Sequence, residues 1–295
     1  MEFEYKNSKK HHYIPKFYLK GFTNENGTFA VYDKLTGRIK KGEHFPDSHF
    51  FEFNRNTLEI EGNKTDFLET KLYSKLDDDL APFFQKIRES DIQYLTFENL
   101  FPIKMFISFL FWRIPRNDQL IQDILKDEKL SNQNLFYQKR DTNESISEEE
   151  FNKIKKNPLF QRLYSFVLPF TTFKIEPHVG EENYWKAIGD PSAGINLTSD
   201  NPIILKREDI FYGEGQIMLV PITSNKMILY GQTDHIKILP PEFYLQCDLA
   251  IMHQSERYVC GPSKKYLEDI LELYKIEKEF NKTHEIIPKL FRYLE

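Results

Sequence analysis

The hydrophobic pattern changes twice along the chain, and each change predicts a different kind of secondary structure. In the first third, alternating residues around Gly37 predict a β-hairpin over residues 28–40. In the middle, apolar residues recur at helical spacing. From about Trp185, short apolar runs separated by Gly, Pro, Asn and Asp predict strands. The other expected strands are 49–53, 57–60, 185–188, 195–198, 203–205, 216–222, 226–230 and 257–260, and the expected helices are 15–20, 65–88, 96–114, 118–125, 241–253, 264–280 and 285–294.

Strands and helices occur in blocks and do not alternate, which favours an α+β fold over a doubly wound one. We expect an N-terminal β-hairpin region, central helices, and C-terminal antiparallel or mixed strands with flanking helices. The late strands need the early hairpin or the helices to complete a core, so residues 1–295 are predicted to form a single compact domain. Residues 126–157 are polar and predict an exposed, mobile excursion, within which Ser145 to Glu148 has a capping-box pattern and Asn157-Pro158 a helix stop.

Composition narrows the classes of function. The chain has 295 residues, of which 40% are hydrophobic and 15% aromatic, enough for a sizeable core. Its net charge of −5 argues against broad duplex binding, so contact with nucleic acid must come from a local basic patch. Cys247 and Cys260 do not form a C-x-x-C pair, and no Walker loop, G-x-G-x-x-G, H-E-x-x-H or G-x-S-x-G motif is present.

The sequence also predicts a cellular location. Its first residues lack the apolar segment of a signal peptide. The most apolar run, residues 100–112, contains Pro102 and Lys104 and is shorter than the roughly 20 residues that a spanning helix needs. We therefore expect a cytoplasmic protein with no membrane partner.

The basic, aromatic start of the chain is the first candidate for chemistry. His11 and His12 can act as base, acid or ligand near neutral pH, and Tyr13 and Lys16 follow them. Neighbouring side chains of a strand point to opposite faces, so at most one of the two histidines faces a given site. With the nearby lysines and aromatic residues, this segment could hold a phosphate or stack a base. The alternative is a solvated basic start with one histidine packed and the other exposed.

Two arginines, Arg113 and Arg116, flank the end of the expected helix 96–114. A guanidinium offers paired donors for phosphate or carboxylate, and the alternatives are a cation complementing a helix C-terminus or a buried arginine with a carboxylate partner. Asp200 and Asn201 follow a strand-like run, where they could do chemistry or bind metal, or could form an ordinary Asx turn. His253 lies close to a predicted strand.

An acidic set could hold a divalent cation. Glu69 and Asp77 are eight residues apart, near one face of the expected helix. Paired carboxylates there could bind Mg²⁺ or Mn²⁺, and the alternative is a solvated helix face. The dipeptide His11-His12 also suggests the opening of HNH nucleases, but the ββα-metal continuation is absent.

Taken together and in this order, the motifs resemble the bacterial family known as domain of unknown function 4238. The matching pieces are His11-His12-Tyr13-Ile14-Pro15-x-Phe17-Tyr18-Leu19-x-x-Phe22, Val31-Tyr32-Asp33-Lys34-x-Thr36-Gly37, the acidic helix at 72–87, Arg113-Ile114-Pro115-x-Asn117 and Ser199-Asp200-Asn201-Pro202.

The resemblance implies a small, standalone cytoplasmic protein of a family in which some members have been linked to conflict with phages or other invaders. It gives His12, Arg113, Asp200 and Asn201 more weight than their residue types alone. The family places Asn where this chain has His253.

These residues predict two functions. The first is a nuclease or phosphodiesterase acting on RNA or DNA, as a defence or toxin-type effector. His11 or His12 would be the base or acid, Arg113 and Arg116 would stabilise phosphate, Asp200 would orient His12 or bind a metal, and Asn201, Tyr13, Lys16 and His253 would position the substrate. The alternative is a binding or sensor protein for an anionic small ligand or a protein partner.

Overall fold

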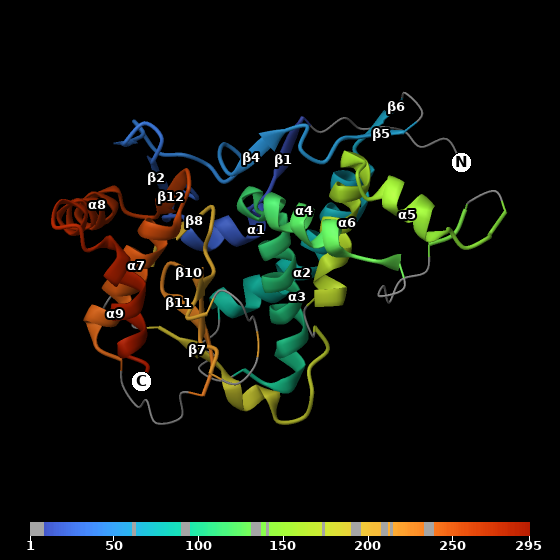
Figure 1. The fold of residues 1–295 in the computed structure, drawn as a ribbon. Coiled ribbons are helices and arrows are strands. Elements are labelled where there is room, and N and C mark those ends of the chain that lie inside the picture. The colour runs from blue at the N-terminus through green and yellow to red at the C-terminus, as the bar shows by residue number, and fades with distance from the viewer. Residues whose placement is uncertain are drawn as a thin grey trace.

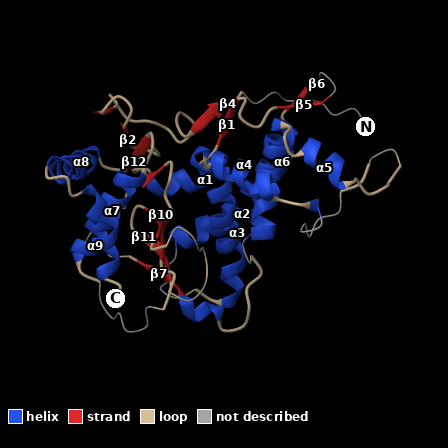
Figure 2. Cartoon of the chain, viewed as in Figure 1, coloured by secondary structure: helices blue, strands red, loops and turns tan. Residues whose placement is uncertain are grey.

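The computed structural model describes residues 9–60, 63–89, 95–130, 137–139, 142–172, 175–189, 196–207, 212, 215–232 and 239–295. Figure 1 shows helices on both sides of the strands, and Figure 2 shows the strands gathered between helical blocks. All strand pairs are antiparallel, and strands and helices are segregated, which confirms the α+β prediction.

The strands are β1 (Lys10–His12), β2 (Ala30–Asp33), β3 (Arg38–Ile39), β4 (Phe51–Phe53), β5 (Leu58–Ile60), β6 (Asn63–Thr65), β7 (Trp185–Ile188), β8 (Thr198–Ser199), β9 (Ile204–Leu205), β10 (Met218–Thr223), β11 (Lys226–Tyr230) and β12 (Tyr258–Gly261). They form two four-stranded sheets, in the orders β3-β2-β12-β8 and β7-β11-β10-β9, and two ribbons, β1-β4 and β5-β6. The expected hairpin is β2–β3, with Gly37 at a φ of +66° in its turn.

The α-helices are α1 (Lys16–Leu19), α2 (Ser74–Glu89), α3 (Phe97–Arg113), α4 (Asp118–Asp127), α5 (Glu148–Ile154), α6 (Pro158–Thr172), α7 (Pro241–Gln254), α8 (Lys264–Glu279) and α9 (Ile286–Arg292). A π-helical segment, η2 (Leu68–Tyr73), leads into α2, and the shorter 3₁₀ segments are η1 (Lys20–Phe22), η3 (Pro115–Asn117), η5 (Glu181–Tyr184) and η6 (Thr283–Glu285). In the described part of the chain, no helix has the length and apolar character needed to cross a membrane.

Both sheets are buried between two helical layers. On β10, Met218 and Val220 face the core shared with α1, α2 and α3, whereas Leu219 between them faces the core shared with α7, α8 and α9. The central strand β12 divides in the same way, with Val259 and Cys260 in different cores. A strand that is covered on both faces has a continuous run of apolar residues, which explains the short apolar runs in the sequence after residue 185.

The buried side chain of Tyr18 joins the first helix to both sheets. Its hydroxyl lies 2.7 Å from the Thr198 hydroxyl on β8 and donates to the Pro221 carbonyl of β10 at 2.8 Å. Gly21 packs equally closely, since a Cβ there would lie 2.7 Å from the Ile222 carbonyl oxygen. These contacts fix the start of the chain, and with it β1, against the late strands.

The polar segment 126–157 differs from its prediction in part. Ser147, two residues after the expected cap, begins α5 by accepting from the Glu150 backbone, and Glu150 returns the hydrogen bond. Phe151 is fully buried, so this helix is anchored. Residues 131–136 and 140–141 of the expected excursion lie outside the described residues, as does Ile195 of an expected strand. Helix α5 ends at Ile154, before the expected stop at Asn157-Pro158, and Pro158 begins α6, a helix that the sequence did not predict.

Candidate functional site

The β1–β4 ribbon carries the two histidines. Its register pairs Lys10 with Phe53, His11 with Glu52, and His12 with Phe51. Because side chains alternate along a strand, His11 and Glu52 share one face, which we call the inner face. Lys10, His12, Phe51 and Phe53 share the other, which we call the outer face. The adjacent histidines therefore face different surroundings, as the sequence predicted.

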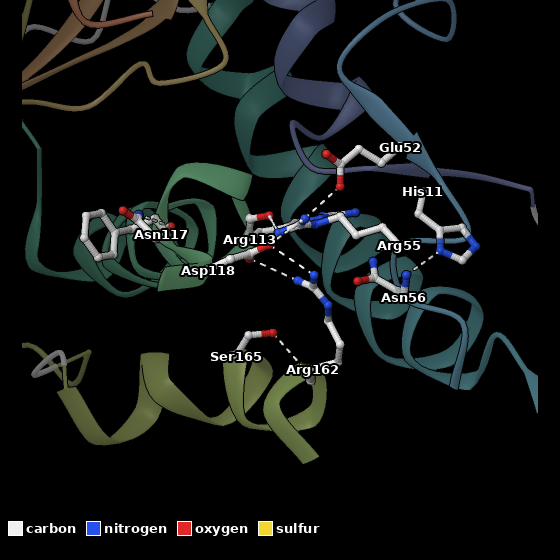
Figure 3. A network of polar contacts seen from close by, with 10 residues as sticks. His11, Glu52, Arg55, Asn56, Arg113, Asn117, Asp118, Arg162 and Ser165 are labelled. Carbon is white, nitrogen blue, oxygen red and sulfur yellow. Dashed lines mark hydrogen bonds and ion pairs between the residues drawn. The ribbon is translucent and has the colours of Figure 1, made fainter. Parts of the chain in front are cut away.

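On the inner face, His11 is fully buried and engaged in hydrogen bonding. Its Nδ1 accepts from the Asn56 backbone N–H at 2.8 Å, as Figure 3 shows. Its Nε2 lies 3.7 Å from Asp66 Oδ1, and Asp66 also accepts from the Thr57 hydroxyl at 2.6 Å. Through these contacts, His11 stabilises the turn after β4.

Arg113, at the end of α3, belongs to the same buried network. Its guanidinium donates to Asp77 Oδ1 and Oδ2 at 2.8 and 3.1 Å, lies 4.0 Å from Glu69, and covers the Tyr73 ring at 4.3 Å. Burial raises the pKa of Asp77, opposed by the positive charge of Arg113. Of the readings that the sequence allowed, the buried arginine with a carboxylate partner is the one observed, and Glu69 and Asp77 face Arg113.

Arg55 is the central member of this network that the sequence analysis missed. Figure 3 shows Arg55 and Arg162 converging on Asp118, with Oδ1 accepting at 2.6 Å from Arg55 and at 3.0 Å from Arg162. Arg55 also donates to Glu52 and to the Arg113 carbonyl. No local motif marks Arg55, because Arg113 and Asp118 lie 58 and 63 residues away along the chain, and only the fold brings them together.

On the outer face, His12 is 7% exposed, and its Nε2 is buried without a hydrogen-bond partner among the described residues. The ring donates a hydrogen bond to the Asp47 carbonyl. Because Nε2 is the nitrogen without a partner, the donating nitrogen is Nδ1, which carries the ring proton. Burial, followed by the positive charges of Lys16 and Arg113, lowers the pKa of His12 to about 4. At neutral pH, His12 is thus an uncharged imidazole with an unused nitrogen, surrounded by cations.

Tyr13 and Lys16 lie in different environments, one buried and one exposed. Tyr13 is 4% exposed and packs edge-on against Phe50, and burial raises its pKa, with the charge of Asp200 adding to the effect. Phe17 and Tyr18 also lie in the core. The aromatic residues that the sequence suggested for base stacking are therefore core residues. Lys16 is exposed and near enough for its charge to act on His12.

Asp200 and Asn201 organise the corner between α7 and β12. The two carboxylate oxygens of Asp200 accept from the backbone N–H groups of Glu256, Arg257 and Tyr258, at 3.0, 2.6 and 3.0 Å. Asn201 Nδ2 donates to the Gln254 carbonyl at 3.2 Å. The expected interaction of Asp200 with His12 is replaced by these long-range contacts with the segment that leads into β12, which an Asx turn does not describe either, because an Asx turn bonds a backbone N–H only about two residues along the chain.

His253, at the end of α7, is a second partly buried histidine with an unused nitrogen, since its Nδ1 has no partner among the described residues. Its pKa is lowered by burial and then by the charges of Lys34 and Arg116. Arg116 therefore lies close enough to His253 to act on it, although they come from opposite helical layers. Lys34 holds this corner by donating to the carbonyls of Met252 and His253 at 3.1 and 2.9 Å.

The candidates thus fall into separate groups. The charges of Lys16 and Arg113 act on His12, the charge of Asp200 acts on Tyr13, and the charge of Arg116 acts on His253. His11 lies on the inner face. Over the described ranges, no group of three His, Cys, Asp or Glu side chains could hold a metal ion, so the expected Mg²⁺ or Mn²⁺ has no protein site of that kind there. Cys247 and Cys260 are both buried free thiols.

The chain is thus an α+β protein whose β1–β4 ribbon carries His11 on its inner face and His12 on its outer face. The family model described as protein of unknown function (DUF4238) matches residues 10–265, most of the chain. The chain belongs to this family, and the match confirms the resemblance identified from the motifs. Searches of curated proteins and of solved structures found no match.

Proposed function

We propose that the chain binds a phosphate-bearing anionic ligand at the outer face of the β1–β4 ribbon, where His12 receives it. The observation that supports this is the buried Nε2 of His12, which lacks a partner among the described residues and is surrounded by the charges of Lys16, Arg113 and Lys10. A buried polar atom without a partner costs roughly 1–3 kcal/mol, which a ligand would recover.

The chemistry of binding follows from the pKa. A phosphate close to His12 offsets the neighbouring cations and favours the imidazolium, so the pKa of His12 rises when the ligand binds. Nε2 then gains a proton and donates it in a charged hydrogen bond to a phosphate oxygen. Binding therefore takes up a proton, and affinity falls as pH rises through the pKa of the bound state.

An NMR titration of the His12 ring proton tests this proposal. The probe is dimethyl phosphate, whose single negative charge is the same at about pH 5 and about pH 8. We expect the diester to raise the pKa of His12 from about 4 and to bind more tightly at the lower pH. His12→Gln should weaken binding by roughly 10- to 150-fold, the worth of one hydrogen bond to a charged group.

The matched control is His284→Gln, since the side chain of His284 is 72% exposed and lies on the C-terminal segment. This variant should bind the diester like the wild type. If the diester leaves the His12 titration unchanged, or if His12→Gln binds as tightly as the wild type, the proposal is wrong.

Phosphodiester hydrolysis is a second candidate, favoured by the tautomer of His12. With one ring N–H donated to Asp47, Nε2 has a free electron pair and can accept a proton from an attacking hydroxyl or water. The test is cleavage of labelled RNA and DNA, with and without Mg²⁺ or Mn²⁺. His12→Gln should slow cleavage about 100- to 10,000-fold, and His284→Gln should not. A diester that binds while neither nucleic acid is cut identifies a binding protein.

A further inference from the structure

The outer face of the ribbon presents two aromatic rings beside the cations. Phe53, which pairs with Lys10 across the ribbon, is 66% exposed. The ring centroids of Phe51 and Phe53 are 5.3 Å apart at 81°. Lys10 Nζ lies 4.7 Å above the Phe51 ring, and the His12 ring lies 5.4 Å from it on the same face. A single small surface thus combines flat apolar rings with positive charge.

The backbone holds these rings in place. Phe50 and Asn54, the residues on either side of β4, have φ angles of 60° and 58°. A left-handed conformation is costly for phenylalanine and persists only where the surroundings enforce it. Phe50 is fully buried, with Tyr258 and Tyr13 packed against its ring. The three-residue strand between these turns is therefore fixed, and its exposed rings are presented with little freedom to move away.

We infer that the outer face binds single-stranded nucleic acid, with a base stacked on Phe53 and the neighbouring backbone phosphate at His12. This inference rests on the proposed phosphate site and adds the class of ligand. Aromatic side chains stack on any base, and lysines beside them follow the backbone charge. Lys10 and Lys16 supply that charge next to His12.

The same surface disfavours duplex. In a duplex, base faces are covered by their neighbours, so the rings would have nothing to stack on. The rings of Phe51 and Phe53 stand at 81° to each other, so they cannot both lie flat against bases of one continuous stack. The net charge of −5 also argues against the broad positive surface that duplex binding requires.

Fluorescence anisotropy with labelled oligonucleotides tests the inference on the full chain. The probes are oligothymidine and oligouridine of about 12 nucleotides, and a duplex of the same length. Single strands should bind more tightly than duplex. Phe53→Ala should weaken their binding roughly 5- to 150-fold, the effect of losing one base–aromatic stack. Lys10→Gln should reduce the slope of log affinity against log salt by about 0.7, the release expected for one phosphate contact on a single strand.

The control for Phe53→Ala is Phe280→Ala. Phe280 is 69% exposed and has Lys282 Nζ 6.0 Å from its ring, but it follows α8, a helix that lies to the left of the β1–β4 ribbon in Figure 1 and is not paired with it. Phe280→Ala should leave oligonucleotide affinity unchanged. Equal losses in both variants, no loss in Phe53→Ala, or duplex binding as tight as single-strand binding would overturn the inference.

Dimethyl phosphate separates this inference from the proposed function. Phe53→Ala should still bind the diester with the wild-type shift in the His12 pKa, because only the stacking surface is removed. If the diester binds at His12 but oligonucleotides bind no more tightly than the diester, the phosphate site stands and the single-strand inference fails. If neither binds, both fail.

Discussion

The two faces of the β1–β4 ribbon place similar residues in opposite situations. On the inner face, His11 accepts from the Asn56 backbone and lies beside Asp66, within a network in which Arg113 meets Asp77 and Arg55 meets Asp118. On the outer face, His12 has an unused Nε2, cations around it, and an exposed phenylalanine nearby. Satisfied groups hold a fold together, whereas unsatisfied buried groups suggest a ligand.

The two faces differ in how close their charged side chains lie to groups of opposite charge. Carboxylates from η2, α2 and α4 surround the inner face, and they neutralise its arginines within hydrogen-bond distance. The charges that act on His12 are those of Lys16 and Lys10, together with Arg113 from the inner network, and they lower the pKa of His12. We therefore expect mutations of the inner face to change stability and mutations of the outer face to change binding. Four predictions test this division, from the largest expected effect to the smallest.

Removing Arg113 should have the largest effect on stability. Arg113→Met leaves the partly buried Asp77 without its ion-pair partner and should lower the free energy of unfolding by about 3 kcal/mol, the lower end of the range for breaking a buried pair. Urea denaturation measures the change. Lys75→Ala, which removes an exposed ion pair with Asp79 on the same α2 helix, is the control and should leave the free energy of unfolding nearly unchanged. Similar losses in the two variants would mean that the inner network does not hold the fold.

The pH dependence of the free energy of unfolding should show the effect of the lowered pKa of His12. Its folded-state pKa is lowered to about 4 from 6.5, so between these values the unfolded chain binds a proton that the folded chain does not. Stability should fall as pH decreases from about 6.5 to about 4, by up to about 3 kcal/mol from His12 alone. His12→Gln should remove this part of the slope in unfolding measurements across that range.

A phosphate diester should oppose the acid destabilisation in the wild type, because it raises the pKa of His12. His49, whose pKa burial also lowers to about 4, should keep its own part of the slope in His12→Gln. A slope that His12→Gln leaves unaltered would place His12 in water rather than in the buried position described.

Exchanging each histidine for phenylalanine compares the two faces directly. His11→Phe leaves the Asn56 backbone N–H without its acceptor and should cost about 1–3 kcal/mol in thermal or urea unfolding. His12→Phe should cost less, because the Asp47 carbonyl that loses the His12 donor still accepts from Lys10 Nζ at 3.5 Å, and Nε2 has no partner to lose within the described chain. This variant should nevertheless abolish the response to dimethyl phosphate. The reverse order of stabilities would contradict the division between the faces.

Phe53→Ala should have the smallest effect on stability. Because this side chain is 66% exposed, its removal should change the free energy of unfolding by less than about 0.5 kcal/mol. The same variant should lose oligonucleotide affinity, so a single substitution separates binding from folding. A large loss of stability would show that Phe53 packs against the molecule in solution.

The sequence predicted most elements because their signals are local. Residues 226–230 were predicted as a strand and form β11, and residues 241–253 form all but the last residue of α7. Helix α6 was missed because Asn157-Pro158 was read only as a stop, although proline also suits the first turn of a helix. The expected helix 65–88 begins instead with the π-helical segment η2, and it continues through Pro82.

The candidate site was predictable only in part. The alternation of a strand was enough to separate His11 from His12, whereas the contacts of Asp200 with the backbone of residues 256–258 are long-range and no local pattern predicted them. Arg55 and Phe53 were missed because neither carries a local motif. Tyr13 was assigned to substrate because exposure cannot be read from an aromatic residue alone, and the structure places it in the core.

What the sequence by itself determined is the kind and order of the elements, the opposite orientation of the two histidines, and membership of the family. These follow from periods of two and of about 3.6 residues and from short motifs, which involve neighbours in the chain. Only the tertiary structure decided which strand pairs with β1, which carboxylate neutralises Arg113, and that His12 keeps an unused nitrogen beside Phe51. Those outcomes depend on contacts between distant segments, and hydrogen bonding and burial there are set by the packing of the whole chain.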